Sequence, residues 1–120
     1  MPPPPPAATS PPADLPAVAF LYVTAPDADA AAALARTLVE ERLIACGNVL
    51  PGVRSVYRWD GAVTEDAEAV LICKTTAANA AAAAERIAEL HPYDLPAVTR
   101  FDAAGGLPDF LRWVAGEVAG

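Results

Sequence analysis

Residues 40–75 read EERLIACGNVLPGVRSVYRWDGAVTEDAEAVLICKT, and this stretch decides the fold. Two segments rich in apolar, β-branched and aromatic residues flank Asp60-Gly61, a dipeptide that tolerates the positive φ angles of a tight turn. The pattern predicts one long β-hairpin. Arms of about 15 residues at roughly 3.3 Å per residue would make it on the order of 50 Å long. Such a hairpin either bends or reaches a neighbour, and Pro51-Gly52 predicts a bulge in its first arm.

The composition is that of one soluble domain. The chain has 120 residues, of which 54% are hydrophobic and 19% charged, with a net charge of -7. This balance argues against nucleic acid or an anionic membrane as partner, because both require clustered Lys and Arg. Cations fit the charge better, although acidity that serves solubility alone is a second interpretation.

The N-terminal residues 1–16, MPPPPPAATSPPADLP, hold eight of the 13 prolines and show no apolar periodicity. They predict an extended or disordered tail ahead of a folded domain at 17–120. The tail lacks the basic start and apolar run of a secretory signal, and no later segment has the apolar length of a membrane span. A cytoplasmic protein is therefore expected.

The segments around the hairpin predict alternating strands and helices. Val18–Thr24 is a nearly continuous apolar run typical of a central strand. Asp27 is expected to cap a helix with one apolar stripe, and Thr75 or Thr76 to cap a second helix from Ala77 onward that ends at Pro92. The stripes are Ala31, Leu34, Ala35 and Leu38 in the first helix, and Ala80, Ala83, Ala84, Ile87 and Leu90 in the second.

A further strand is expected at Leu95–Phe101 and a third helix from Pro108, carrying Phe110, Leu111, Trp113 and Val114. The order βαββαβ followed by α predicts an α+β, ferredoxin-like fold with an additional C-terminal helix. The second hairpin arm is apolar at alternating and at intervening positions, so both sheet faces should be buried. Helices cover one face, and a homo-oligomer is the simplest cover for the other.

Four motifs resemble the CutA divalent-cation tolerance family: ERLIACGNVLPGVRSVYRWDG at 41–61, KT at 74–75, ELHPYDLP at 89–96 and PDFLRW at 108–113. The resemblance covers nearly all of residues 18–118. It implies a cytoplasmic homotrimer akin to PII signalling proteins, with sheets facing the threefold axis and long hairpins overlapping. It also implies a role in tolerance of copper and other divalent metals and in the response to metal ions.

Three residues depart from the pattern of that family. Gly47 stands where relatives often have Val or Ala, and Phe110 replaces the usual Tyr, so any contact of that hydroxyl is absent here. Leu107 replaces a polar residue that would cap the last helix, a loss that typically costs about 1 kcal/mol.

Candidate metal ligands are Cys46, Cys73, His91 and Asp94. A two-residue turn at Asp60-Gly61 would place Cys46 opposite Thr75 and Cys73 opposite Asn48, which makes the cysteines diagonal neighbours on one face. A bulge at Pro51-Gly52 would instead move one of them to the other face. Reduced thiols are expected, either as a Cu(I) site or as small buried hydrophobes.

His91 is the only histidine of the chain and has two interpretations. It would bind a metal ion with Asp94, or interact with the last carbonyls of the second helix. The resemblance implies copper or another divalent cation as the candidate ligand, and no cofactor is expected to be required for folding.

Two groups of hairpin residues are further candidates. The acidic patch Glu65, Asp66 and Glu68 would bind cations weakly or form a solvated edge. Arg54, Tyr57, Arg58 and Trp59 have the chemistry of subunit contacts or of a cleft.

No Ser-His-Asp arrangement, phosphate loop or metalloprotease signature occurs, so an enzyme is not expected. The resemblance to PII-like trimers implies an alternative, a small-effector sensor with sites between subunits. That cleft would use Asn48, Lys74, His91 and Tyr93 from adjoining chains. A stable trimeric scaffold that presents a partner surface is the third hypothesis.

Overall fold

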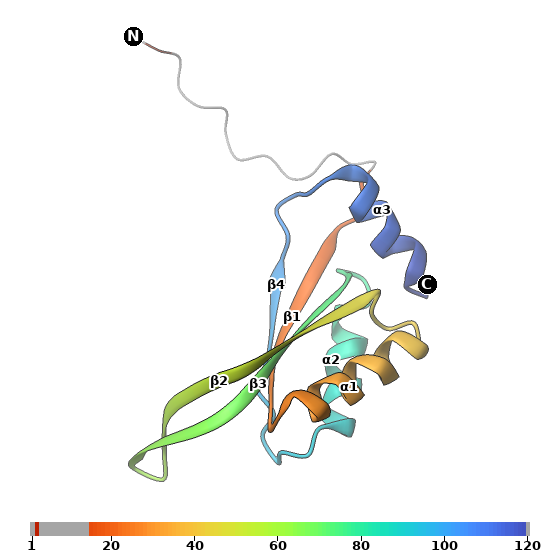
Figure 1. Cartoon of the computed structure of the whole chain (residues 1–120). Helices are drawn as coiled ribbons and strands as arrows, with labels where there is room; N and C mark the ends of the chain where they lie inside the picture. The colour runs from red at the N-terminus through yellow and green to blue at the C-terminus, as the bar shows by residue number, and fades with distance from the viewer. Residues whose placement is uncertain (1, 3–14, 120) are drawn as a thin grey trace.

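The computed structural model describes residue 2 and residues 15–119, so the predicted tail at 1–16 falls almost entirely outside the described residues. Four strands and three helices follow one another in the described part (Figure 1). They are β1 (Val18–Ala25), α1 (Ala28–Glu40), β2 (Cys46–Trp59), β3 (Ala62–Thr76), α2 (Ala80–Leu90), β4 (Val98–Asp102) and α3 (Pro108–Glu117). The predicted α+β order βαββαβ-α is confirmed.

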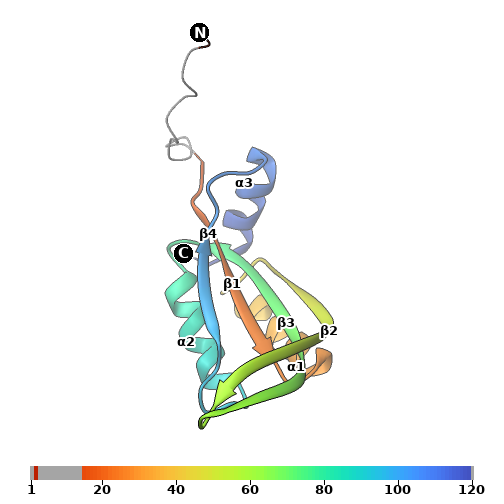
Figure 2. The same ribbon diagram turned by 90° about the vertical axis from the view of Figure 1, so that its left-hand side faces the viewer.

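The strands form one antiparallel sheet in the order β2-β3-β1-β4, which is the ferredoxin-like arrangement. β1 is central, as its apolar run predicted. Figure 2 shows the sheet in front of α1 and α2, which lie together behind it. The main core lies between these two helices and the sheet, and its largest fully buried side chains are Leu21, Leu38, Ile44, Leu71 and Ile87.

The start of α1 follows the predicted local chemistry. The Asp27 side chain accepts a hydrogen bond from the Ala30 amide at 2.8 Å, which satisfies one of the unpaired donors of the first turn. The predicted stripe of α1 is buried: Ala31, Leu34, Ala35 and Leu38.

The start of α2 differs from the prediction. Thr75 and Thr76 belong to β3, and the helix begins at Ala80 with Asn79 as its N-cap residue. The reason is a tertiary contact, since the fully buried Thr75 hydroxyl donates to the Leu43 carbonyl at 2.7 Å. This bond holds Thr75 in the strand. The predicted apolar face of α2 and its end before Pro92 are confirmed.

β4 is shorter than predicted, because it begins at Val98 and not at Leu95. Its pairing with β1 would have to continue opposite Thr24 and Ala25. The Thr24 carbonyl instead accepts a hydrogen bond from the His91 ring, and Pro96 has no amide hydrogen to donate. Residues 92–97 therefore form a loop.

α3 begins at Pro108, as predicted, and Leu107 at its N-cap makes no side-chain capping bond. Leu111, Val114 and Val118 pack with Val18 in a second, smaller cluster. Side chains alternate between the two faces of a strand, so Val18 points to the opposite face of β1 from the main-core residues Ala19 and Leu21. α3, which packs on Val18, therefore closes the end of the sheet and does not join the layer of α1 and α2.

The β2–β3 hairpin has the predicted turn, with φ of 49° at Asp60 and 77° at Gly61. It reaches beyond the helices (Figure 1). Gly52 has a φ of 73°, and the register shifts between Leu50 and Val53, so the predicted bulge is confirmed. It turns the hairpin and changes which residues face each other beyond it.

The bulge corrects the predicted pairing of the two cysteines. Cys46 faces Lys74 and Cys73 faces Gly47, whereas the uninterrupted register had placed them opposite Thr75 and Asn48. A one-residue shift exchanges the two faces of a strand. The alternative in which a bulge moves one cysteine to the other face is confirmed.

The sheet face opposite α1 and α2, here called the open face, carries exposed apolar side chains in the single chain. Tyr22 is 41% exposed, Leu50 43% and Phe101 57%. They come from β1, β2 and β4 and so extend across the sheet. The prediction that both sheet faces are apolar agrees with this surface.

Candidate functional site

A cleft of about 550 Å³ opens between the outer half of the hairpin and the loop before β4. Three of its lining residues are aromatic, namely Tyr57, Trp59 and Tyr93, and three are acidic, namely Asp66, Glu68 and Asp94. Thr24, Ser55, Leu95 and Ala97 complete the lining. We call it the aromatic-acidic cleft.

The register of the hairpin places alternate side chains in this cleft. Ser55 faces Asp66 across the two strands, and Tyr57 and Trp59 follow on the same face. Glu65 lies on the other face, where it pairs with Arg54. The predicted acidic patch is thus divided, with Asp66 and Glu68 in the cleft and Glu65 outside it.

Two tyrosine hydroxyls hold two carboxylates of the cleft. The Tyr57 hydroxyl donates to Asp66, and the Tyr93 hydroxyl donates to Glu68 at 2.9 Å. Burial and the bond to Glu68 raise the pKa of Tyr93 to about 12. The bond to Asp66 is the main cause that raises the pKa of Tyr57. Both phenols therefore stay protonated donors at neutral pH.

His91 fixes the loop wall of the cleft. Its Nδ1 accepts from the Tyr93 amide at 3.1 Å, so its Nε2 carries the proton and donates to the Thr24 carbonyl at 2.7 Å. The ring is 7% exposed and lies 4.8 Å from the Tyr93 ring. Because both nitrogens are occupied, His91 positions Tyr93 in this conformation and offers no lone pair to a ligand.

Replacing His91 by Leu should lower the free energy of unfolding by about 2 kcal/mol, because the Thr24 carbonyl and the Tyr93 amide both lose their partner. Urea unfolding at neutral pH measures the change. Tyr93→Phe is the matched control, since it removes only the exposed bond to Glu68 and should cost less than about 1 kcal/mol. Equal losses in the two variants would contradict the bridging role of His91.

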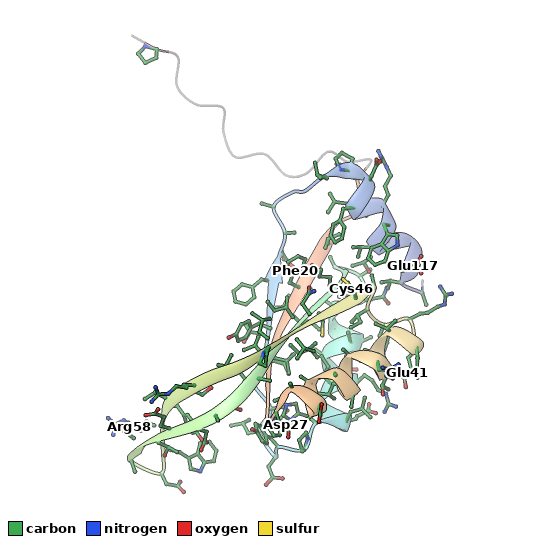
Figure 3. The ribbon with its side chains drawn as sticks, in the orientation of Figure 1. Phe20, Asp27, Glu41, Cys46, Arg58 and Glu117 are labelled. Atoms are coloured by element: carbon green, nitrogen blue, oxygen red, sulfur yellow. The ribbon has the colours of Figure 1, made fainter. Side chains whose placement is uncertain are left out.

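A second group of candidate residues lies at the other end of the sheet, near α3. The Lys74 ammonium is 5.6 Å from the ring centroids of both Phe20 and Phe110. Cys46 faces Lys74 across β2 and β3, and Figure 3 shows Cys46 and Phe20 at this end, away from Arg58 in the outer hairpin. Phe110, which departs from the family pattern, thus forms part of a cation–π site for Lys74.

The predicted cleft residues are divided between these two places. Asn48 and Lys74 lie on the open face toward α3, while His91 and Tyr93 lie at the aromatic-acidic cleft. Thr24, which binds His91, faces Val70, four residues before Lys74 on β3, or about 13 Å along the strand. One chain does not bring all four together, and sharing them between subunits stays a prediction.

The four candidate metal ligands are also dispersed. Cys73 is fully buried in the main core, and Cys46 is half-buried on the open face. Burial raises the pKa of Cys46, with a smaller opposing effect of the Lys74 ammonium, and it raises the pKa of Cys73 to about 12. Within residues 2 and 15–119, no three His, Cys, Asp or Glu side chains are grouped to hold a metal ion.

The sequence indicated Tyr57 and Trp59 as contact or cleft residues but missed Thr24, Ser55, Leu95 and Ala97. Small and apolar side chains give no chemical signal, and only the packing of the loop against the hairpin brings them together. Arg58, the other basic candidate of the hairpin, donates from Nη1 to the Gly61 carbonyl at 3.2 Å and supports the turn.

The fold and the cleft define a ferredoxin-like α+β protein with an extra C-terminal helix and a protruding hairpin that forms one wall of a surface cleft. Residues 19–117 match the family model described as CutA1 divalent ion tolerance protein. The chain belongs to this CutA1 family, as its motifs indicated.

Relatives and solved structures agree with this assignment. A divalent-cation tolerance protein CutA from Thermus thermophilus is 42% identical over 94 residues, which cover 78% of this chain and 91% of the relative. The crystal structure of CutA from Xylella fastidiosa is 40% identical, with a TM-score of 0.83, and the match covers 85% of this chain and 98% of that one. The chain spans only 52% of a chloroplastic relative from Arabidopsis thaliana.

A CutA structure from Archaeoglobus fulgidus is described as periplasmic. It is 30% identical, with a TM-score of 0.82, and the match covers 85% of this chain and 99% of that one. Cytoplasmic location therefore stays a prediction for this chain. Among the described helices, none is long and apolar enough to cross a membrane.

Proposed function

We propose that this chain acts in divalent-cation tolerance as a non-enzymatic, cytoplasmic homotrimer that binds copper or another divalent cation. Membership of the CutA1 family supports the tolerance role, since relatives carry that name. The open face is the observation that supports the proposed homotrimer. It exposes Tyr22, Leu50 and Phe101 across the sheet, and such a surface favours burial against further copies of the chain.

The trimer would bury this face and let each long hairpin reach the next subunit. A heterologous contact that closes into a ring uses two different surfaces of each chain, and the hairpin and the open face are two such surfaces. Assembly around a threefold axis would also bring together three copies of any ligand on the open face that lies close to the axis.

Cys46 is the ligand of the proposed set best suited to copper in such an assembly. It is half-buried on the open face, and a thiolate is a preferred ligand of Cu(I). Cys73 faces the core, and His91 uses both of its nitrogens inside the chain, so neither contributes without a rearrangement. Asp94 in the aromatic-acidic cleft would suit a harder cation.

Light scattering combined with titration calorimetry tests this function on reduced, metal-free protein. We expect the mass of a trimer, and we expect Tyr22→Glu to lower it, because a charge would be buried in the contact. Cu(I) should bind stoichiometrically, and Cys46→Ala should weaken that binding at least tenfold.

The control for the copper titration is Cys73→Ala, which removes the thiol of the core and should leave Cu(I) affinity unchanged. A monomeric mass would refute the assembly. A trimer whose Cu(I) and Cu(II) affinities are both negligible would refute direct copper binding and favour a sensor of small effectors.

The second candidate function is a PII-like sensor of small effectors. Asn48 and Lys74 favour it, since both lie on the open face, where a neighbouring subunit would complete a cleft with its own His91 and Tyr93. Lys74 offers a cation between two aromatic rings for an anionic effector. A trimeric scaffold requires neither copper nor effector binding.

A further inference from the structure

The walls of the aromatic-acidic cleft combine aromatic rings with carboxylates, and of these lining residues the cation and sensor proposals use only Asp94 and Tyr93. Trp59 is 55% exposed, Tyr57 39% and Tyr93 37%, so all three rings are accessible to a ligand. Two of them come from β2 and the third from the loop before β4, which places aromatic surface on both walls. Aromatic faces carry negative electrostatic potential and attract cations.

The acidic groups of the cleft also favour a positively charged ligand. Asp66, Glu68 and Asp94 line it, and none of the lining residues is Lys, Arg or His. The arginines of the hairpin are engaged elsewhere. Arg54 pairs with Glu65 on the opposite face, and Arg58 binds the Gly61 carbonyl near the turn. No basic side chain among the lining residues therefore balances the charge of the carboxylates in the cleft.

The tyrosine hydroxyls organise these carboxylates without neutralising them. Tyr57 donates one hydrogen bond to Asp66, and Tyr93 donates one to Glu68. A carboxylate has about four acceptor positions, so each keeps positions for a ligand. The Tyr93 wall is held in turn by His91, which binds the Thr24 carbonyl and the Tyr93 amide. The site is therefore pre-formed on the loop side.

We propose that the aromatic-acidic cleft binds a small organic cation, such as an alkylammonium or trimethylammonium compound. The apolar body of such a ligand would pack on Trp59 and Tyr57, while its charge would be balanced by Asp66 and Glu68. A bare divalent ion fits less well, because aromatic rings supply no oxygen ligands and the described residues hold no group of three metal-binding side chains. The volume of about 550 Å³ accommodates a compact organic molecule.

This site is independent of the proposed Cu(I) site at Cys46, since it uses neither cysteine, and it shares only Asp94 with the proposed ligands of a harder cation. It requires that the cleft stay open in the protein as it assembles in solution. A second copy of the chain that filled the cleft would exclude the organic cation, and the test must therefore be made on the whole chain in its native assembly.

The test titrates the whole chain with choline and follows the indole N–H signals of its two tryptophans by NMR. Trp59 should shift saturably, while Trp113, which lies on α3 away from the cleft, should not. The neutral isostere 3,3-dimethylbutan-1-ol has the same shape without the charge and should bind at least fivefold more weakly, the factor that a cation–π contact of about 1 kcal/mol represents.

Two matched substitutions separate the cleft from the rest of the hairpin. Glu68→Gln keeps an acceptor for the Tyr93 hydroxyl but removes the charge, and should weaken choline binding at least fivefold. Glu65→Gln removes the same charge from the opposite face and should leave the affinity unchanged. Equal binding of choline and the neutral alcohol, no effect of Glu68→Gln, or no shift of Trp59 would each overturn the proposal.

Discussion

Gly47→Val should lower the free energy of unfolding by about 3 kcal/mol, the upper part of the range for overpacked cores. A Cβ atom added at Gly47 would lie 2.9 Å from the Ala35 Cβ and 3.0 Å from a Leu71 methyl group. Both neighbours belong to the main core, and Ala35 is held by α1. Valine would add two further methyl groups to a space that does not admit the first carbon. Urea unfolding measures the loss.

The control for this clash is Gly105→Val, because no heavy atom other than those of Gly105 and its two chain neighbours lies within 4 Å of the Cβ position at Gly105. Its effect should stay within about 0.5 kcal/mol. A double-mutant cycle identifies the contact more directly. Gly47→Ala should cost less in the presence of Ala35→Gly than alone, since the second change removes the clashing methyl group. Additive effects of the two changes would contradict the close approach.

The close approach at Gly47 involves one of the three residues that depart from the expected family pattern. α1 lies close to β2 at this position, since the strand has no side chain at Gly47 and the helix offers only a methyl group at Ala35. The sequence indicated only that Gly47 departs from the family pattern. It did not reveal the helix on the other side, because that contact joins residues far apart in the chain.

The parts of the fold that could be predicted rest on local chemistry. Asp60-Gly61 tolerates positive φ wherever it occurs, and Asp27 caps α1 with a bond to an amide three residues away. The predicted register of the hairpin was correct from the turn to Val53, because the two-residue turn at Asp60-Gly61 sets it. Beyond Val53 it was wrong by one residue, because the predicted bulge adds a residue to one strand only.

The start of α2 and the start of β4 could not be predicted, since each depends on a partner elsewhere in the chain. Thr75 has the chemistry of a helix cap, but its hydroxyl binds the Leu43 carbonyl 32 residues away. β4 begins late because His91 takes the Thr24 carbonyl, a contact over 67 residues. In both cases a tertiary hydrogen bond overrides a local preference.

The candidate site was predicted in its residue types and not in its arrangement. Tyr57, Trp59 and Tyr93 were all indicated, yet no pattern placed the first two in a cleft with the third. His91 was a candidate metal ligand as the only histidine of the chain. The structure gives it a positioning role, because its two nitrogens bridge a strand and a loop. Residues that act through backbone contacts leave no chemical signature in a sequence.

Ionisation of Cys73 alone should lower the free energy of unfolding by as much as about 4 kcal/mol between about pH 9 and pH 12. Each pH unit in this range contributes about 1.36 kcal/mol. Burial raises the pKa of this thiol from its ordinary value of 9.0 to about 12 in the folded chain. The unfolded chain therefore releases the proton first as the pH rises. The contribution of Cys73 to the free energy of unfolding is fully present below about pH 9 and is lost as the pH approaches 12.

Urea unfolding at several pH values under reducing conditions, compared with Cys73→Ala, isolates this effect. The variant lacks the thiol but keeps Tyr57 and Tyr93, whose raised pKa values add a similar alkaline loss to both proteins. Below pH 9 the variant should be less stable, because the missing sulfur leaves a small cavity in the core. The gap should shrink above pH 9 and reverse before pH 12. A constant gap across this range would show that Cys73 titrates alike in the folded and unfolded chains, and would place it in a wetter environment than the core of this fold.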